Sequence, residues 1–248
     1  MNSTILIVGA SSGIGKETAL VFSQNNWNVI ACSRNLKKLN TLAKQTYKNL
    51  YPCRLDITDK NNLNINITKI VKKYGVPDIV FLNAGTNNPN SKDIVSYKET
   101  LKLFDTNFFG IIHCIETLIP HLRKKNNSQL VIMSSVAGYR GLPYASAYCS
   151  SKSALISFAE SIYNQCKEVG ISVRIVCPGF VKTPLTDKND FKMPMIITAE
   201  KAGKIIYKKL VFSKKFEISF PKLFCFFMKA LKLLPNFIFL RITSLLLK

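Results

Sequence analysis

Two side chains in the middle of the sequence could exchange a proton together, Tyr148 and Lys152 in Tyr-Cys-Ser-Ser-Lys. On a helix, residues four apart lie on one face. A phenol has a pKa near 10, and a neighbouring ammonium favours the phenolate and lowers that pKa. This spacing occurs often by chance. It predicts proton transfer here because an apolar run upstream ends in Ser134 and Ser135, and because a glycine-rich turn lies further upstream.

That glycine-rich turn could hold a phosphate group. Residues 9–15 read Gly-Ala-Ser-Ser-Gly-Ile-Gly between an apolar run and a helical pattern. Glycines let the backbone turn sharply and approach a pyrophosphate, and the following helix presents free N–H groups and its positive dipole end. A plain tight turn is the alternative. The strand–turn–helix context favours phosphate binding.

The end of the second apolar run bears on the choice of dinucleotide. It reads Cys32-Ser33-Arg34-Asn35, without the acid that NAD-preferring proteins usually place there for the ribose hydroxyls. Arg34 can instead meet a 2′-phosphate bidentately, whereas the alternative is a solvated residue at the start of a helix. The sequence therefore favours NADP(H) over NAD(H).

Together these motifs resemble the short-chain dehydrogenase/reductase family over roughly residues 3–185. The likeness also includes the stretches Asn83-Ala84-Gly85 and Pro178-Gly179. It implies a Rossmann-type fold and hydride transfer between NAD(P) and a carbonyl or alcohol carbon. One departure is Val8, which stands where the family usually has Thr and removes one supporting hydrogen bond.

The resemblance also implies a role for individual residues. Tyr148 would donate the proton in reduction, Ser135 would hydrogen-bond the substrate oxygen, and Lys152 would hold the nicotinamide ribose. Asn107 would support a water-mediated proton relay from the lysine, and Asp56 would contact the adenine. The implied catalytic set is Asn107, Ser135, Tyr148 and Lys152. The implied cofactor contacts are Gly9, Ser11, Ser12, Gly13, Ile14, Gly15, Arg34, Asp56, Ile57, Asn83, Ala84, Gly85, Tyr148, Lys152, Pro178, Gly179, Val181 and Thr183.

The elements that must position these residues alternate along the chain. Short apolar runs and longer amphipathic stretches predict an α/β fold, a three-layer doubly wound parallel sheet of about seven strands. We expect strands at residues 4–8, 29–33, 50–55, 79–82, 129–134, 172–177 and 217–220. Helices should begin near residues 14, 36, 60, 97, 144 and 199, and residues 179–198 should form a loop. One Rossmann-type domain would thus span residues 1–220, followed by C-terminal apolar helices in a basic extension, residues 221–248.

The net charge of +21 raises the question of nucleic acid. Only 6 of the 35 basic residues are Arg, whereas nucleic-acid recognition favours the planar Arg fork. No nucleic-acid reading module accompanies the charge, and much of it is typical of a Lys-rich composition. We expect no nucleic-acid partner. The seven cysteines have irregular spacing, without a zinc pattern, so we expect no metal and a reducing compartment.

The charge gathers at the C-terminal end, where residues 201–248 carry 11 basic residues and one acid. Apolar residues recur there at helical spacing between lysines, which is typical of helices that lie on a membrane surface. We expect peripheral membrane contact through residues 223–248. The alternative is a lid over the pocket or a contact with another subunit in a homodimer or homotetramer. The sequence opens on a strand pattern without a signal peptide, so we expect a cytoplasmic protein at the cytoplasmic membrane face.

Two functions remain open on these residues. The first is an NADP-preferring oxidoreductase that acts on CH–OH or C=O groups of an apolar substrate, with Tyr148 as proton donor or acceptor. The second is a catalytically silent cofactor-binding regulatory or scaffold protein of the same fold. The four catalytic residues occur together, which favours the enzyme, because a pure binder needs only the cofactor contacts.

Overall fold

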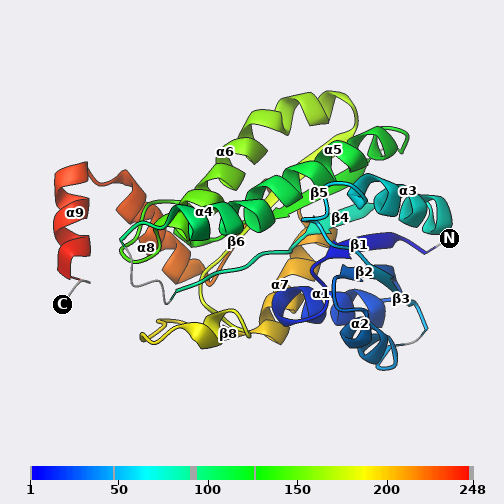
Figure 1. Cartoon of the computed structure of the whole chain (residues 1–248), viewed down its shortest axis with the longest axis horizontal. Helices are drawn as coiled ribbons and strands as arrows, with labels where there is room; N and C mark the ends of the chain where they lie inside the picture. Colours follow the sequence, from blue (N-terminus) through cyan, green and yellow to red (C-terminus); the bar gives the residue numbers. More distant parts are fainter. Residues whose placement is uncertain (1, 47, 90–93, 126, 246–248) are drawn as a thin grey trace.

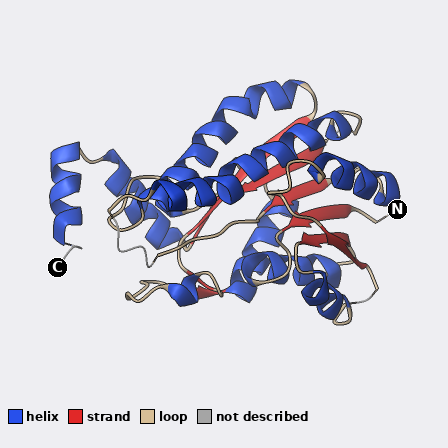
Figure 2. Ribbon diagram, viewed as in Figure 1, coloured by secondary structure: helices blue, strands red, loops and turns tan. Residues whose placement is uncertain are grey.

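A seven-stranded, fully parallel sheet forms the centre of the molecule, with strand order β3-β2-β1-β4-β5-β6-β9 (Figure 1). The computed structural model describes residues 2–46, 48–89, 94–125 and 127–245. The strands of this sheet are β1 (Thr4–Val8), β2 (Asn28–Ser33), β3 (Leu50–Arg54), β4 (Ile79–Leu82), β5 (Ser128–Met133), β6 (Ile171–Pro178) and β9 (Glu217–Phe220). Helices cover both faces of this sheet, so the predicted three-layer doubly wound fold is confirmed (Figure 2).

The two faces of the sheet carry separate apolar clusters. Along β1, Ile5 and Ile7 face one cluster, whereas Leu6 and Val8 face the other, because successive strand residues point to opposite faces. Seven helices lie between the strands along the described chain. They are α1 (Gly13–Gln24), α2 (Leu36–Ala43), α3 (Leu63–Tyr74), α4 (Tyr97–Phe104), α5 (Gly110–Leu122), α6 (Ser146–Glu168) and α7 (Ala199–Phe212). Burial on both faces explains why the strands read as continuous apolar runs.

The strand order reverses direction at β1, which pairs with β2 on one side and β4 on the other. Val8 at the end of β1 is in register with Cys32 of β2 and Leu82 of β4. The loops after these strands therefore leave the sheet at one edge and diverge. This is the crevice in which open α/β sheets bind ligands.

The seven predicted strands agree with the observed ones to within one residue at each end. Two helix starts differ more. Helix α3 begins at Leu63 rather than near Lys60, because a carboxylate oxygen of Asp59 accepts the Asn62 N–H in a turn before it. Helix α6 begins at Ser146 rather than near Tyr144, whose backbone is left-handed with φ +59°.

The segment from residue 179 to 198 is more ordered than the predicted loop. Its ends form two short parallel strands, β7 (Val181–Lys182) and β8 (Ile197–Thr198), which pair in a second small sheet. The prediction of a plain loop is therefore wrong at both ends. Strands of two residues are too short to show an alternating pattern in a sequence.

The two C-terminal helices expected from the sequence are α8 (Lys222–Leu233) and α9 (Asn236–Ser244), each preceded by a proline. Cys225 and Met228 of α8 join the apolar cluster that also contains α5 and α6. Residues 246–248 of the predicted extension lie outside the described residues, and the division of the chain at residue 220 stays a prediction. In the ranges that the structure describes, every helix is too short or too polar to cross a bilayer.

Candidate active site

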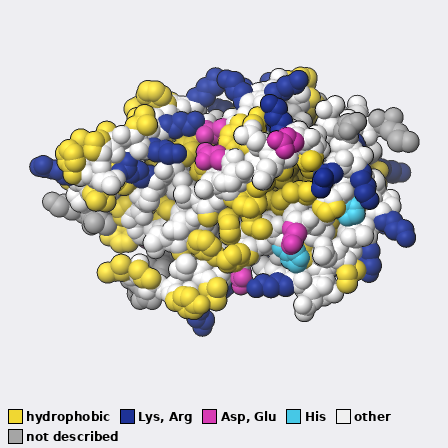
Figure 3. Space-filling model, turned by 90° about the horizontal axis from the view of Figure 1, so that it is seen from above, with side chains coloured by type: hydrophobic (Ala, Val, Ile, Leu, Met, Phe, Trp, Pro, Cys, Tyr) yellow, Lys and Arg dark blue, Asp and Glu magenta, His cyan; other side chains and the backbone are white. Residues whose placement is uncertain are grey.

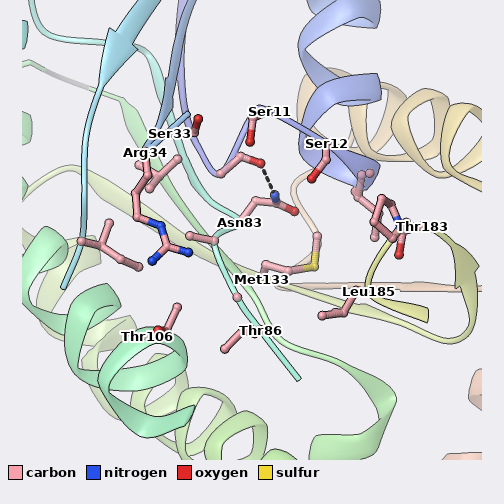
Figure 4. Close-up of a pocket in the computed structure, with 18 of the residues that line it drawn as sticks. Ser11, Ser12, Ser33, Arg34, Asn83, Thr86, Thr106, Met133, Thr183 and Leu185 are labelled. Carbon is pink, nitrogen blue, oxygen red and sulfur yellow. Dashed lines mark hydrogen bonds between the residues drawn. The ribbon is translucent and has the colours of Figure 1, made fainter. Parts of the chain in front are cut away.

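A cavity of about 350 Å³ opens at the carboxyl edge of the sheet, where the loops after β1, β2, β3, β4, β5 and β6 meet. Figure 4 shows its lining, with Arg34 and Ser33 on one side and Thr183 and Leu185 on the other. Fifteen of the predicted site residues line it: Gly9, Ser11, Ser12, Gly13, Ile14, Arg34, Asp56, Ile57, Asn83, Ala84, Gly85, Tyr148, Lys152, Pro178 and Thr183. The fold thus gathers residues that are far apart in the sequence into one site.

The glycine-rich turn brings β1, α1 and the loop after β4 very close together. Gly9 has φ +88°, and an added Cβ would lie 2.8 Å from the Ala84 backbone. A Cβ on Gly15 would collide with the Gly9 carbonyl oxygen and with Asn83 Nδ2. That same Asn83 Nδ2 donates a hydrogen bond of 2.9 Å to Gly9 O (Figure 4). Glycine is required at both positions by this close approach.

The start of α1 offers an anion site beside this turn. Ser12 is the N-cap residue, yet its side chain makes no capping hydrogen bond. Within the described part of the chain, the first N–H groups of the helix have no side-chain acceptor, and they carry the positive end of the helix dipole. Ser11, Ser12 and Gly13 all line the cavity. This arrangement fits the pyrophosphate of a dinucleotide.

Arg34 marks the other end of the cavity. It follows β2 directly, and its guanidinium extends into the pocket on the side of Thr106 (Figure 4). Among the described residues it forms neither a hydrogen bond nor an ion pair, so its donors face solvent. The N-cap of the next helix is Asn35 and not Arg34, because the Asn35 side chain accepts a hydrogen bond from Lys38 N. Arg34 is therefore placed to receive an anionic group from the cavity.

Asp56 follows β3 and also lines the cavity. Its Oδ1 accepts from the backbone N–H of Thr58 at 3.0 Å and from the Thr58 hydroxyl at 2.7 Å. These bonds hold the loop that also presents Ile57 to the cavity. The expected adenine contact of Asp56 stays a prediction.

Tyr148 and Lys152 share one face of α6 as predicted, and the Lys152 ammonium lies 5.8 Å from the Tyr148 ring centre. Lys152 is buried and donates to the Met133 carbonyl oxygen at 3.1 Å. Burial lowers the pKa of Lys152 to about 8, because desolvation disfavours the ammonium. The amine is still mostly protonated at neutral pH.

The pKa of Tyr148 moves in the opposite direction to the one that the sequence predicts. Burial raises it to about 12, and a hydrogen bond with Ser135 offsets only part of that rise. The neighbouring ammonium does not outweigh the desolvation of the phenolate. Tyr148 is therefore a phenol across the neutral range, which is the form that can donate a proton.

Ser135 lies at the end of β5, at the start of a short 3₁₀ turn. Its Oγ accepts from Ala137 N at 3.1 Å and donates to the Pro178 carbonyl oxygen at 3.4 Å. Its neighbour Ser134 is buried and donates instead to the Lys152 carbonyl oxygen at 2.8 Å. Of the two serines, Ser135 is thus the one that reaches Tyr148.

Asn107 lies in a π-helical turn, Asp105–Phe109, between α4 and α5. Its Oδ1 accepts from Thr86 N at 2.7 Å, and its Nδ2 donates to Thr86 O at 2.9 Å and to Ser151 Oγ at 3.2 Å. The buried amide thereby links the loop after β4 to α6. Such π-turns are frequent at functional sites, but helical periodicity in the sequence gives no sign of one.

Five predicted site residues do not line the cavity: Gly15, Asn107, Ser135, Gly179 and Val181. Conversely, the prediction missed Val8, Ser33, Asn35, Leu55, Thr58, Thr86, Thr106, Met133, Ser134, Pro184 and Leu185, which do line it. Several of these directly follow a predicted motif, as Thr86 follows Gly85. Their position next to a motif at the end of a strand is the feature of the sequence that could have identified them.

The comparisons with known proteins agree with this geometry. A family model described as short chain dehydrogenase matches residues 3–193. The chain belongs to the short-chain dehydrogenase/reductase family. The family consists of oxidoreductases that bind NAD(P), and the glycine turn, the start of α1 and Arg34 fit such a dinucleotide.

Two bacterial relatives show the range of this similarity. An uncharacterized oxidoreductase of Myxococcus xanthus is 31% identical over 239 residues, which cover 95% of this chain and 94% of that protein. The 3-oxoacyl-(acyl-carrier-protein) reductase FabG of Thermotoga maritima is 31% identical over 186 residues, covering 74% of this chain and 76% of the relative.

Solved structures show the same fold. The structure of ElxO with NADP bound has a TM-score of 0.76 at 28% identity, covering 88% of this chain and 97% of that one. A short-chain dehydrogenase from Streptomyces avermitilis has a TM-score of 0.81 at 22% identity, covering 93% of this chain and 92% of that one. The latter likeness concerns the fold alone.

Proposed function

We propose that this protein is an NADP(H)-dependent oxidoreductase that interconverts the carbonyl and alcohol groups of an apolar substrate. The observation that carries the proposal is the convergence of Tyr148, Lys152 and Ser135. Tyr148 and Lys152 line the cavity of about 350 Å³, and Ser135 makes a hydrogen bond with Tyr148. A protein that only binds a dinucleotide needs the glycine turn and the start of α1. It does not need a phenol, a buried ammonium and a hydroxyl together.

The chain's own residues account for the proton and the developing charge. When bound, NADPH supplies the hydride. Ser135 and Tyr148 donate hydrogen bonds to the carbonyl oxygen of the substrate as that oxygen gains negative charge. Tyr148 then gives up its phenolic proton and completes the alcohol. In the oxidation of an alcohol, the same group accepts the proton.

Lys152 favours this transfer electrostatically. Its ammonium is held by the Met133 carbonyl oxygen, on the same helix face as Tyr148. A fixed positive charge in a buried site stabilises the phenolate that forms when Tyr148 loses its proton. Asn107 does not touch this pair but positions its surroundings, because its amide hydrogen-bonds Thr86 and Ser151.

The preference for NADP rests on Arg34. Arg34 is exposed and has no ion pair among the described residues, and the end of β2 carries no acid. Such a guanidinium suits a 2′-phosphate rather than two ribose hydroxyls. The similar structure of ElxO, which contains bound NADP, supports this preference.

The apolar substrate is proposed from the surroundings of Pro178 and Thr183. Three aromatic rings form a row there, with centres 5.4 Å apart between Phe180 and Phe224 and 5.8 Å apart between Phe180 and Phe191. Pro184 and Leu185, which lie between Phe180 and Phe191 in the sequence, line the cavity itself. Apolar side chains at this side of the site favour a ketone or aldehyde with an apolar body.

The direct test is NADPH oxidation by the purified protein against a panel of ketones and aldehydes, compared with a Tyr148→Phe variant. We expect turnover that falls at least about 100-fold in the variant, because a positioned acid contributes that much or more. NADPH affinity, measured by fluorescence titration, should stay within about threefold.

Tyr163→Phe is the matched control, because it removes a phenol from the same helix far from the cavity, where Tyr163 packs on Phe216. It should leave turnover unchanged. NADPH binding without oxidation of NADPH by any carbonyl compound in the panel would instead identify a silent binder. Substantial remaining activity in Tyr148→Phe would refute the assignment of the proton donor.

A further inference from the structure

Helix α8 has two apolar faces, and only one of them is buried. Cys225 and Met228 pack into the core. The other face carries Leu223, Phe226, Phe227 and Leu233. Phe226 and Phe227 lie three and four positions after Leu223, and Leu233 lies seven positions, about two turns, after Phe226. Phe226 is 67% exposed and Leu233 is 85% exposed. Residues at these spacings form one stripe on a helix.

Helix α9 continues this exposed apolar surface. Phe237 at its start is 75% exposed, and Leu240 one turn later is also exposed, whereas Phe239 is buried under Arg140. Arg140 also binds the carbonyl oxygens at the end of α8, so the corner between the helices is fixed. The C-terminal helices lie at the left end of Figure 3, where hydrophobic side chains gather with Lys and Arg side chains among them.

The charge on this surface has one sign. Residues 218–248 contain no Asp or Glu. Lys229 pairs with Glu217 at 2.7 Å. The remaining basic side chains of the two helices are Lys222, Lys232 and Arg241, and they form no ion pair within the described ranges. All three are exposed. This surface therefore combines exposed Phe and Leu side chains with positive charge that no acid offsets. It is complementary to a surface that has negative charge at its edge and an apolar interior.

We propose that the outer faces of α8 and α9 dock on an anionic lipid surface, with the helices lying along it. A second copy of this chain is the competing occupant. Lys is depleted at the interfaces between protein subunits, whereas helices that lie in a membrane interface combine Phe and Leu with Lys and Arg edges. Two like-charged faces would also repel each other. The docking is independent of the proposed turnover, since none of these residues lines the cavity.

The test is flotation of the full-length protein with vesicles of phosphatidylcholine alone or of phosphatidylcholine mixed with phosphatidylglycerol. We expect binding to the anionic vesicles and little to the neutral ones. Phe226→Ser combined with Leu233→Ser should weaken binding at least about 10-fold, because each buried apolar side chain contributes that much or more. Lys232→Glu should weaken it by a similar factor, because the charge reverses.

Phe212→Ser is the matched control, because Phe212 is 76% exposed but belongs to α7, and it should bind the vesicles like the parent. Urea unfolding of each variant shows whether the fold is kept. Sedimentation measures the mass in solution of the parent and of the variant with Phe226→Ser and Leu233→Ser. It tests whether a second copy of the chain, and not lipid, covers this surface. The proposal is overturned if the anionic vesicles do not bind the parent, or if the substitutions change the mass in solution and leave vesicle binding unchanged.

Discussion

The guanidinium carbon of Arg140 lies 4.1 Å from the centre of the Phe239 ring. The same side chain donates from Nη1 to the carbonyl oxygens of Leu231, Lys232 and Leu234, at 3.3, 2.9 and 2.7 Å. A cation at the C-terminal end of α8 is favoured by the helix dipole and satisfies its free carbonyls. Arg140 lies two residues after the 3₁₀ turn that follows Ser135. Its contacts therefore connect the C-terminal helices to the segment that carries Ser135.

We expect Arg140→Lys to loosen this corner. A lysine has a point charge and cannot keep the planar fork over a ring and several carbonyls. The free energy of unfolding should fall by about 1–3 kcal/mol, and amide hydrogen exchange in α9 should accelerate more than in β5. Arg241→Lys on α9 is the control, since Arg241 is exposed. Equal protection of α9 in parent and Arg140→Lys would contradict the clamp.

Gly15→Ala should disturb the turn at the base of the cavity. The new methyl group would collide with the Gly9 carbonyl oxygen and with Asn83 Nδ2, and such overpacking costs about 1–3 kcal/mol. Urea unfolding and NADPH titration should both show the loss. Gly141→Ala is the matched control, because nothing lies within 4 Å of its added Cβ. Identical behaviour of the two variants would show that the turn can spread without cost.

Arg34→Gln should change the choice of dinucleotide. Loss of a charge-assisted pair with a 2′-phosphate should raise the KM for NADPH about 10- to 100-fold, while the KM for NADH stays within about threefold. The ratio of kcat/KM for the two dinucleotides is the measurement. Lys37→Gln removes a nearby exposed charge and serves as the control. An unchanged ratio in Arg34→Gln would leave the preference without its proposed cause.

Lys152→Met should make the ligand-free protein more stable at neutral pH. In the fold the pKa of Lys152 is about 8, below its ordinary value of 10.5. Between these values the unfolded chain binds more protons than the folded chain, so the free energy of unfolding of the parent rises with pH there. The variant lacks this titration. We expect it to be about 2 kcal/mol more stable at pH 7, after the lost hydrogen bond to Met133 is counted.

Urea unfolding at a series of pH values from 6 to 10 measures this effect. The difference between parent and Lys152→Met should shrink as pH rises through about 8. Lys167→Met in the last turn of the same helix is the control, because Lys167 is exposed. A difference that is constant over this range would show that burial of the ammonium is not the cause.

The sequence by itself determined the sheet, the glycine turn and the shared face of Tyr148 and Lys152. These features depend on neighbours along the chain. Apolar periodicity marks each strand, and the four-residue spacing places two side chains on one helix face whatever surrounds that helix. The family resemblance rests on the same local motifs, and the matched family model confirms it.

Only the tertiary structure decided how each group behaves. The direction of the Tyr148 pKa depends on burial by distant segments, and Asn107 meets Thr86 and Ser151 only because α5, α6 and the loop after β4 pack together. The outer face of α8 is likewise defined by which of its two apolar stripes reaches the core. Desolvation and packing are properties of contacts between residues far apart in the chain, and no local pattern encodes them.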